Sequence, residues 1–198
     1  HARFGRLPFP EVLAPAIRYA EEGFPVGPET ARAWRRAEEI YLPLKGPEFG
    51  PFQEAFFPQG RAPRAGEVWR SPGHAETLRE IARTYGESFY RGNLAKAMAA
   101  FSEATGGLLT LEDLEAHEAE WVNPLSLEYR GLTVHELPPN GQGIATLLAL
   151  AILEGFELRP EDPFSYHLQI EAMRLALADA FHYVADPRYL ERSPQALL

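Results

Sequence analysis

Hydrophobic residues follow a helical spacing over most of the first 120 positions. Apolar residues three or four positions apart predict a helix from Pro10 to Glu22, which a glycine ends. A second helix is expected to begin at Pro28, because a proline in the first helical turn removes an N–H that would have no partner there. The same spacing returns at Leu78–Tyr85 and at Leu94–Phe101, and it predicts two further helices.

Residues 43–73 interrupt this pattern with many Pro, Gly and aromatic residues and little periodicity. A loop of this length is uncommon in a compact domain, so we expect it to pack against another part of the protein. Further along, Thr110–Asp113 has the form of a capping box, in which the two side chains each bond a backbone N–H of the first helical turn. Residues 1–120 are therefore predicted to form a helical lobe.

The period changes to that of strands after Trp121. Apolar residues at 125, 127 and 129 alternate with polar ones, and Arg130–Gly131 stands where a two-residue turn would lie. The segment Leu132–Leu137 follows as a second strand. This pattern predicts a β-hairpin.

Two apolar helices are expected after the hairpin. Gln142–Glu154 is apolar enough to be buried on most sides, and a helix from about Ser165 to Ala185 is ended by Asp186–Pro187. Six apolar residues of the last helix are expected to face inward: Ile170, Met173, Leu177, Ala180, Phe181 and Val184. Residues 121–198 thus contribute a hairpin and two core helices. The predicted class is α+β, predominantly α-helical with a short β-hairpin, compatible with a sheet that other chain segments complete.

Composition narrows the range of partners. The 19 basic and 28 acidic residues give a net charge of -9, which repels nucleic-acid phosphates and anionic lipid surfaces. No apolar run approaches the roughly 20 residues that span a bilayer. The chain has no cysteine, so disulfides, thiolate zinc sites and a cysteine nucleophile are excluded.

Motifs for catalysis or metal binding are sparse. His117–Glu118 resembles the start of a zinc-protease motif, but position 121, where the second histidine would stand, is Trp. The chain has no G-x-S-x-G nucleophile elbow. The six histidines are scattered, and we expect them to be surface or packing residues. The sequence therefore predicts no metal site and no cofactor.

The turn at Gly141–Gly143 follows a predicted strand and opens a helix, as a phosphate-binding turn would. A dinucleotide fingerprint would need a third glycine at position 146, which is Thr, and an acidic residue after a second strand. One interpretation is that the glycines only allow a sharp turn. The other is that backbone N–H groups at the helix start face an active-site cleft. The possible cleft-lining residues are Asn140, Gly141, Gln142 and Gly143.

Five blocks of sequence resemble the γ-glutamyltranspeptidase family, in the same order and over nearly the whole chain. They are Pro15–Val26, Gly106–Leu114, Tyr129–Phe156, His167–Ala176 and Tyr183–Pro187. The form Pro-Pro-Asn-Gly-Gln-Gly at 138–143 is similar to a bacterial branch that includes acylase-like and amidohydrolase-like members. The resemblance therefore leaves the acyl donor open between γ-glutamyl compounds, such as glutathione, and related acyl amides.

The resemblance implies an N-terminal-nucleophile hydrolase that cuts itself into a large and a small subunit. A threonine exposed as the first residue of the small subunit attacks the amide carbonyl, and its own α-amino group acts as the base. The acyl group then passes to water or to an amino acid. The implied fold is an αββα sandwich built from both subunits.

Within that scheme the chain corresponds to an internal part of the large subunit. The nucleophilic threonine is expected downstream of Leu198, and the arginine that grips the γ-glutamyl carboxylate upstream of His1. No catalytic residue of the family falls on a position of this chain, so we expect the fragment to be inactive alone. An alternative is a non-catalytic helical interaction module derived from the family. The aromatic segment 43–73 is the feature that suggests this alternative.

The implied partners are the small subunit, the rest of the large subunit and a small-molecule substrate. The open edges of a lone hairpin also favour aggregation or a homodimer. The sequence does not distinguish a bacterial cytoplasmic protein from a periplasmic or extracellular one.

Overall fold

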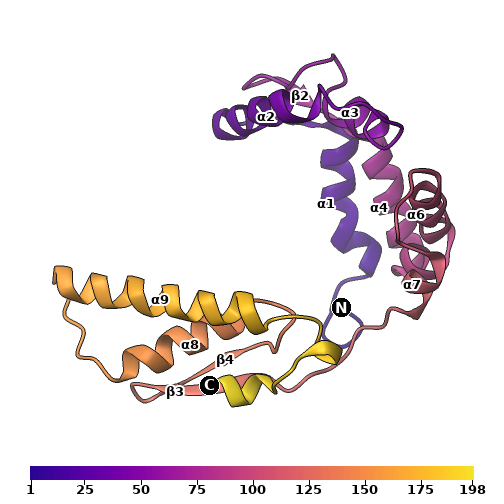
Figure 1. Cartoon of the computed structure of the whole chain (residues 1–198). Coiled ribbons are helices and arrows are strands. Elements are labelled where there is room, and N and C mark those ends of the chain that lie inside the picture. The colour runs from indigo at the N-terminus through magenta and orange to yellow at the C-terminus, as the bar shows by residue number, and fades with distance from the viewer. The chain divides into compact units, whose positions relative to one another are not determined.

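The computed structural model describes residues 1–198 and divides them into two compact units, His1–Glu118 and Ala119–Leu198. The chain is mostly helical, and each unit contains one two-stranded antiparallel sheet (Figure 1). None of the helices combines the length and the apolar character needed to cross a bilayer.

The first unit contains seven helices. They are α1 (Phe9–Glu22), α2 (Pro28–Tyr41), α3 (Gly50–Phe56), α4 (Pro72–Thr84), α5 (Glu87–Arg91), α6 (Asn93–Ala104) and α7 (Leu111–Ala116). The predicted start of α2 at Pro28 is confirmed, and so is the capping box, because Thr110 and Asp113 exchange side-chain and backbone hydrogen bonds. Tyr85 and Gly86 adopt left-handed conformations between α4 and α5, which ends α4 where the pattern predicts.

Helices α1 and α4 pack side by side (Figure 1). The N–H of Ser71 donates to the carbonyl of Ala20 at 2.8 Å, and Arg79 forms an ion pair with Glu21. Helix α4 therefore holds α1 in place from a distant part of the sequence.

The segment 43–73 differs from the expected long loop, because it contains helix α3 and strand β2 (Val68–Trp69). Strand β2 pairs with β1 (Phe24–Pro25), so that Phe24 lies opposite Trp69. Aromatic rings from α2, α3 and β2 form a cluster around Trp69. Its ring centroid lies 5.2 Å from that of Trp34 and 5.8 Å from that of Phe56. The aromatic residues of this segment thus pack within the first unit.

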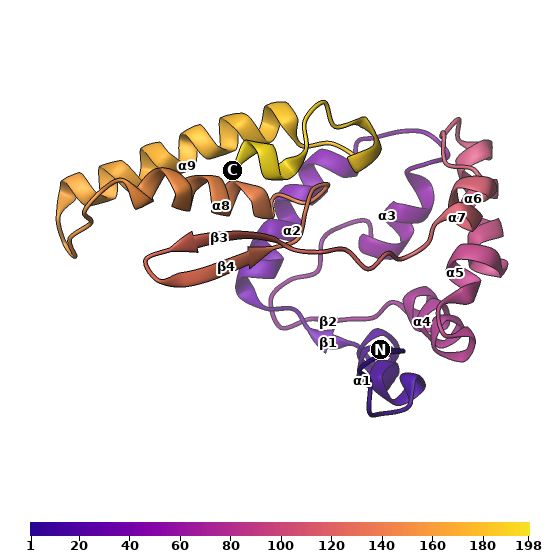
Figure 2. The same ribbon diagram turned by 90° about the horizontal axis from the view of Figure 1, so that it is seen from below.

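The predicted hairpin of the second unit is confirmed (Figure 2). Strand β3 (Leu125–Tyr129) pairs with β4 (Leu132–Glu136), with Tyr129 opposite Leu132. Arg130 and Gly131 have φ values of 50° and 80°, as a two-residue turn with two left-handed positions requires.

Helix α8 (Gly143–Glu154) contacts both the hairpin and helix α9 (Pro163–Tyr183). Asp162 caps α9 by accepting from the N–H groups of Phe164 and Ser165. Two short 3-10 helices, η1 (Pro187–Tyr189) and η2 (Pro194–Leu197), complete the unit. Its buried core consists of Leu125, Ile144, Leu147, Leu148, Ala149 and Ala176.

The predicted inward face of α9 is wrong at its large residues. Ile170 is 60% exposed and Phe181 74% exposed, and Met173 is exposed as well. Ala180 is buried as expected, while Leu177 and Val184 are half-buried. The buried side chains are small ones, namely Ser165, Ala172, Ala176 and Ala180. Small side chains let α8 and α9 approach closely, so the large apolar residues lie on the remaining faces of the helix.

Candidate functional site

The four residues proposed to line a cleft form the connection from β4 to α8. Asn140, Gly141 and Gln142 are exposed, and Gly143 is half-buried. The connection is anchored on both sides, because Pro139 before it and Ile144 after it are buried. The N–H of Ala145 donates to the carbonyl of Gln142 at 2.9 Å, which closes the first turn of α8. The structure therefore presents these residues together at one helix start.

The two glycines of this turn have different structural roles. A Cβ atom on Gly143 would lie 2.5 Å from Oε2 of Glu136 and 3.1 Å from its Cβ. A Cβ on Gly141 would meet nothing within 4 Å, and neither glycine has a positive φ. Close approach of the β4 end to the α8 start thus requires a glycine at position 143 only.

Glu136 also sets the electrostatics of the turn. Its carboxylate lies beside Gly143, at the end of α8 where free backbone N–H groups give a partial positive charge. A second anion at the same place would be repelled by this carboxylate. The arrangement is therefore unfavourable for a phosphate group, whereas a neutral amide would not meet this repulsion.

Two serine–histidine pairs were not predicted from the sequence. Ser71 Oγ bonds Nδ1 of His74 in the first turn of α4, and Ser126 Oγ lies 2.8 Å from Nδ1 of His135 across the hairpin. No carboxylate hydrogen-bonds either imidazole, so neither pair has the third group that orients a catalytic base. The S-x-x-H spacing at a helix start is the signal that could have found the first pair.

His117 has a packing role. Its ring stacks on Tyr90 with centroids 5.1 Å apart, and its carbonyl accepts from Arg91. No group of three or more His, Cys, Asp or Glu side chains is placed to hold a metal ion.

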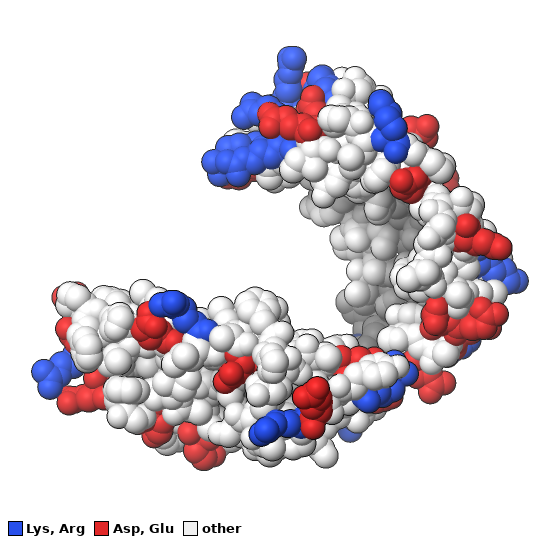
Figure 3. Space-filling model, viewed as in Figure 1, with Lys and Arg blue, Asp and Glu red and all other residues white.

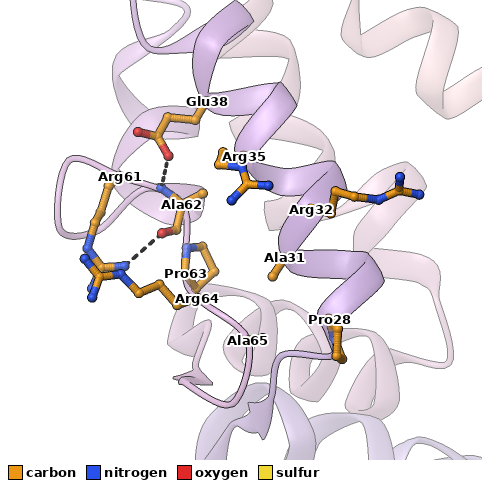
Figure 4. Close-up of a pocket in the computed structure, with 10 residues that line it drawn as sticks. All are labelled: Pro28, Ala31, Arg32, Arg35, Glu38, Arg61, Ala62, Pro63, Arg64 and Ala65. Atoms are coloured by element: carbon orange, nitrogen blue, oxygen red, sulfur yellow. Dashed lines mark hydrogen bonds between the residues drawn. The ribbon is translucent and has the colours of Figure 1, made fainter.

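A hollow of about 370 Å³ lies between α2 and the segment 61–65 of the first unit, and four arginines and one glutamate are among its lining residues. Figure 3 shows basic side chains gathered over α2 and the adjoining loop, with acidic ones between them. The hollow is lined by Pro28, Ala31, Arg32, Arg35, Glu38, Arg61, Ala62, Pro63, Arg64 and Ala65 (Figure 4). No sequence motif indicated it, because its arginines come from two segments about 30 positions apart.

Comparison with known proteins gives a consistent result. The family model for γ-glutamyltranspeptidase matches residues 1–198. The chain is 33% identical to the glutathione hydrolase-like YwrD proenzyme of Bacillus subtilis, over 98% of this chain and 37% of that protein. It is 37% identical to the oxamate amidohydrolase proenzyme of Klebsiella pneumoniae, over 97% of this chain and 36% of that protein.

Solved structures show the same similarity. The cephalosporin acylase from Bacillus halodurans is 50% identical and superposes with a TM-score of 0.94, over 100% of this chain and 37% of that one. The γ-glutamyltranspeptidase of Helicobacter pylori is 26% identical with a TM-score of 0.85, over 99% of this chain and 56% of that one. The chain thus spans little more than a third of the length of the two proenzymes named above.

Proposed function

Because this chain belongs to the γ-glutamyltranspeptidase family, we propose that it forms part of the large subunit of an enzyme that cleaves amide bonds with an N-terminal nucleophile. The observation that carries the proposal is the match of the family model over all 198 residues. The match does not favour the alternative of a non-catalytic helical interaction module.

In this proposal residues 1–120 are a helical lobe of the large subunit, and residues 121–198 contribute to an αββα core. Strands β3 and β4 pair only with each other, so their outer edges carry backbone groups that further strands could bond. Helix α9 exposes large apolar residues such as Ile170 and Phe181. Both features favour a position beside other segments of the parent protein.

The proposed nucleophile is a threonine at the start of the small subunit, outside these 198 residues. Its hydroxyl oxygen attacks the carbonyl carbon of the amide, and the α-amino group takes the hydroxyl proton and delivers it to the leaving amine. Water or an amino acid then accepts the acyl group and frees the threonine. The fragment alone would have no such activity.

The substrate is proposed to be a γ-glutamyl compound such as glutathione or a related acyl amide. The relatives carry the names of a glutathione hydrolase, an oxamate amidohydrolase and a cephalosporin acylase, which share an acyl or amide substrate. Asn140 and Gln142 expose amide side chains that both donate and accept hydrogen bonds. We propose that they and the two glycines beside them line the substrate cleft.

The test begins with the full-length protein that contains this chain. Mass spectrometry and N-terminal sequencing should find two polypeptides, the smaller one beginning with Thr. The processed protein should hydrolyse a γ-glutamyl anilide or a glutaryl amide, and replacement of that threonine by alanine should abolish both cleavage and turnover. An unprocessed single polypeptide without turnover of either substrate would overturn the proposal, and turnover by the isolated 198 residues would overturn the inactivity of the fragment.

A further inference from the structure

The chain has three asparagines, and each is followed by a different residue. They stand in the pairs Asn93–Leu94, Asn123–Pro124 and Asn140–Gly141. The following residue matters because its backbone nitrogen can attack the side-chain amide of the asparagine, and a side chain on that residue obstructs the attack. Glycine obstructs it least, since it has no Cβ atom. Asn140 is therefore the asparagine whose local sequence favours this reaction most.

The structure leaves the peptide between Asn140 and Gly141 free to react. Both residues are exposed, and a Cβ atom on Gly141 would meet nothing within 4 Å. The N–H of Gly141 forms no hydrogen bond of normal geometry, and neither does the side-chain amide of Asn140. Because the two groups belong to adjacent residues, rotation about bonds of the chain is enough to bring them together.

The other two asparagines lack this combination. The residue after Asn123 is a proline, which has no backbone N–H to lose. Asn93 is the first residue of α6, and the N–H that follows it donates to Oγ of Ser88 at 3.4 Å. The helix also fixes the backbone there, whereas closure of a ring requires rotation about it. The chain thus contains two internal controls for Asn140.

We propose that Asn140 is a site of spontaneous deamidation and isoaspartate formation. The nitrogen of Gly141 loses its proton to base and attacks Cγ of Asn140. The N–Cγ bond forms, the Cγ–Nδ2 bond breaks, and the amide nitrogen leaves as ammonia with a proton from water, so that a succinimide ring remains. A water molecule then opens the ring at one of its two carbonyl groups. One opening gives aspartate, and the other gives isoaspartate, in which the β-carbon has entered the main chain.

The reaction changes the chemistry of the connection between β4 and α8. A carboxylate, which only accepts hydrogen bonds when ionised, takes the place of an amide that donates and accepts them. The new charge lies on the same connection as Gly143, beside which Glu136 already places a carboxylate. The deamidated protein should therefore turn over its substrate more slowly than the unmodified one. This consequence rests on the proposed function, whereas the modification itself does not.

The experiment is incubation of the full-length protein at pH 8.5 and 37 °C, followed by proteolytic digestion and mass spectrometry of the peptides. Fragmentation should locate a growing conversion of amide to acid at Asn140, and chromatography should separate the aspartate and isoaspartate forms. The peptides that carry Asn93 and Asn123 should stay unmodified over the same period. A synthetic peptide of residues 137–145 gives the rate without the fold, and the rate in the protein should lie within about tenfold of it.

Two glycine variants test the mechanism in folded protein, which circular dichroism should verify for both. Gly141→Ala should slow the conversion about tenfold or more, because the added methyl group hinders attack by the backbone nitrogen. Gly155→Ala is the matched control, an exposed glycine of the same unit with φ of -76°, and should leave the rate within about twofold. The proposal is overturned if Asn140 stays intact in the protein while the synthetic peptide is converted, or if Gly141→Ala leaves the rate unchanged. Conversion without loss of turnover would overturn only the consequence for the cleft.

Discussion

Gly143 is the residue at which the connection between β4 and α8 tolerates least change. Its hydrogen atom occupies the place where a Cβ would meet Glu136 at 2.5 Å. The turn therefore depends on a contact between a strand end and a helix start, and not on an unusual backbone conformation.

Gly143→Ala should lower the free energy of unfolding by about 1–3 kcal/mol, because the added methyl group forces the Glu136 side chain aside. Gly141→Ala is the control and should change stability by no more than about 0.5 kcal/mol, since its Cβ would lie in open space. Urea unfolding followed by circular dichroism measures both. The explanation fails if Glu136→Ala does not recover most of the loss in the double variant.

The carboxylate of Glu67 should make the stability of the protein depend on pH. Its pKa is lowered to about 2 by Arg61 and by the N–H of Arg64, while an unfolded glutamate titrates near 4.3. Its contribution to stability is therefore fully present above pH 4.3 and is lost as the pH falls towards 2. Glu67→Gln should reduce the loss of stability between pH 5 and pH 3, measured as urea midpoints.

The control for this pH experiment is Glu39→Gln on helix α2, because Glu39 forms no ion pair. It should leave the pH dependence close to that of the unchanged protein. If Glu67→Gln and Glu39→Gln behave alike, the bond between Glu67 and Arg61 does not explain the acid sensitivity.

Among the secondary-structure elements, the hairpin depends most on its turn. Gly131→Val should destabilise the second unit by about 1–2 kcal/mol, because φ is 80° at this position and a branched side chain is strained there. Thr133→Val keeps a similar volume within β4 and should cost less, although it removes a bond to Glu128. Thermal unfolding of both variants compares them, and equal losses would show that the turn does not limit the hairpin.

Elements whose signals lie close together in the sequence were predictable. The hairpin and the capping box of α7 follow from residues no more than a few positions apart, and the structure has both. Strands β1 and β2 were missed because each has two residues and the pairing joins positions 24–25 to 68–69. Helix α3 was missed because its seven residues begin Gly-Pro and carry two phenylalanines without a clear polar face.

The residues of helix α9 that face the core were predicted wrongly because of the distribution of apolar residues around this helix. Its sequence is apolar on several sides, so the spacing identifies a helix but does not show which face contacts α8. Packing selected the small residues Ala172, Ala176 and Ala180. The hollow between α2 and the segment 61–65 could not be predicted either, because its four arginines come from two segments about 30 positions apart in the sequence.

For the molecule as a whole, the large apolar residues on α9 predict that the isolated chain self-associates. Ile170→Lys and Phe181→Lys should lower the apparent mass in analytical ultracentrifugation, because each places a charge on an exposed apolar position. Ala178→Lys adds the same charge to an exposed position of α9 without removing a large apolar side chain, and should change the mass less. A monomeric unchanged chain would contradict the prediction.

In the full-length protein the same two lysine substitutions should lower the stability of the fold. If other segments cover α9 there, a lysine at position 170 or 181 would be buried without a partner and would lower the melting temperature. Equal melting temperatures for the unchanged and substituted full-length proteins would show that this face stays open to solvent.

The packing of α1 against α4 has a consequence for synthesis of the protein. Helix α1 ends at Glu22 and α4 begins at Pro72, about 50 residues later. A ribosome that adds about 5–20 residues per second needs roughly 3–10 s to make the intervening chain. During that interval the apolar side of α1 has no α4 to cover it, so the growing polypeptide offers a binding site for chaperones and a target for proteases.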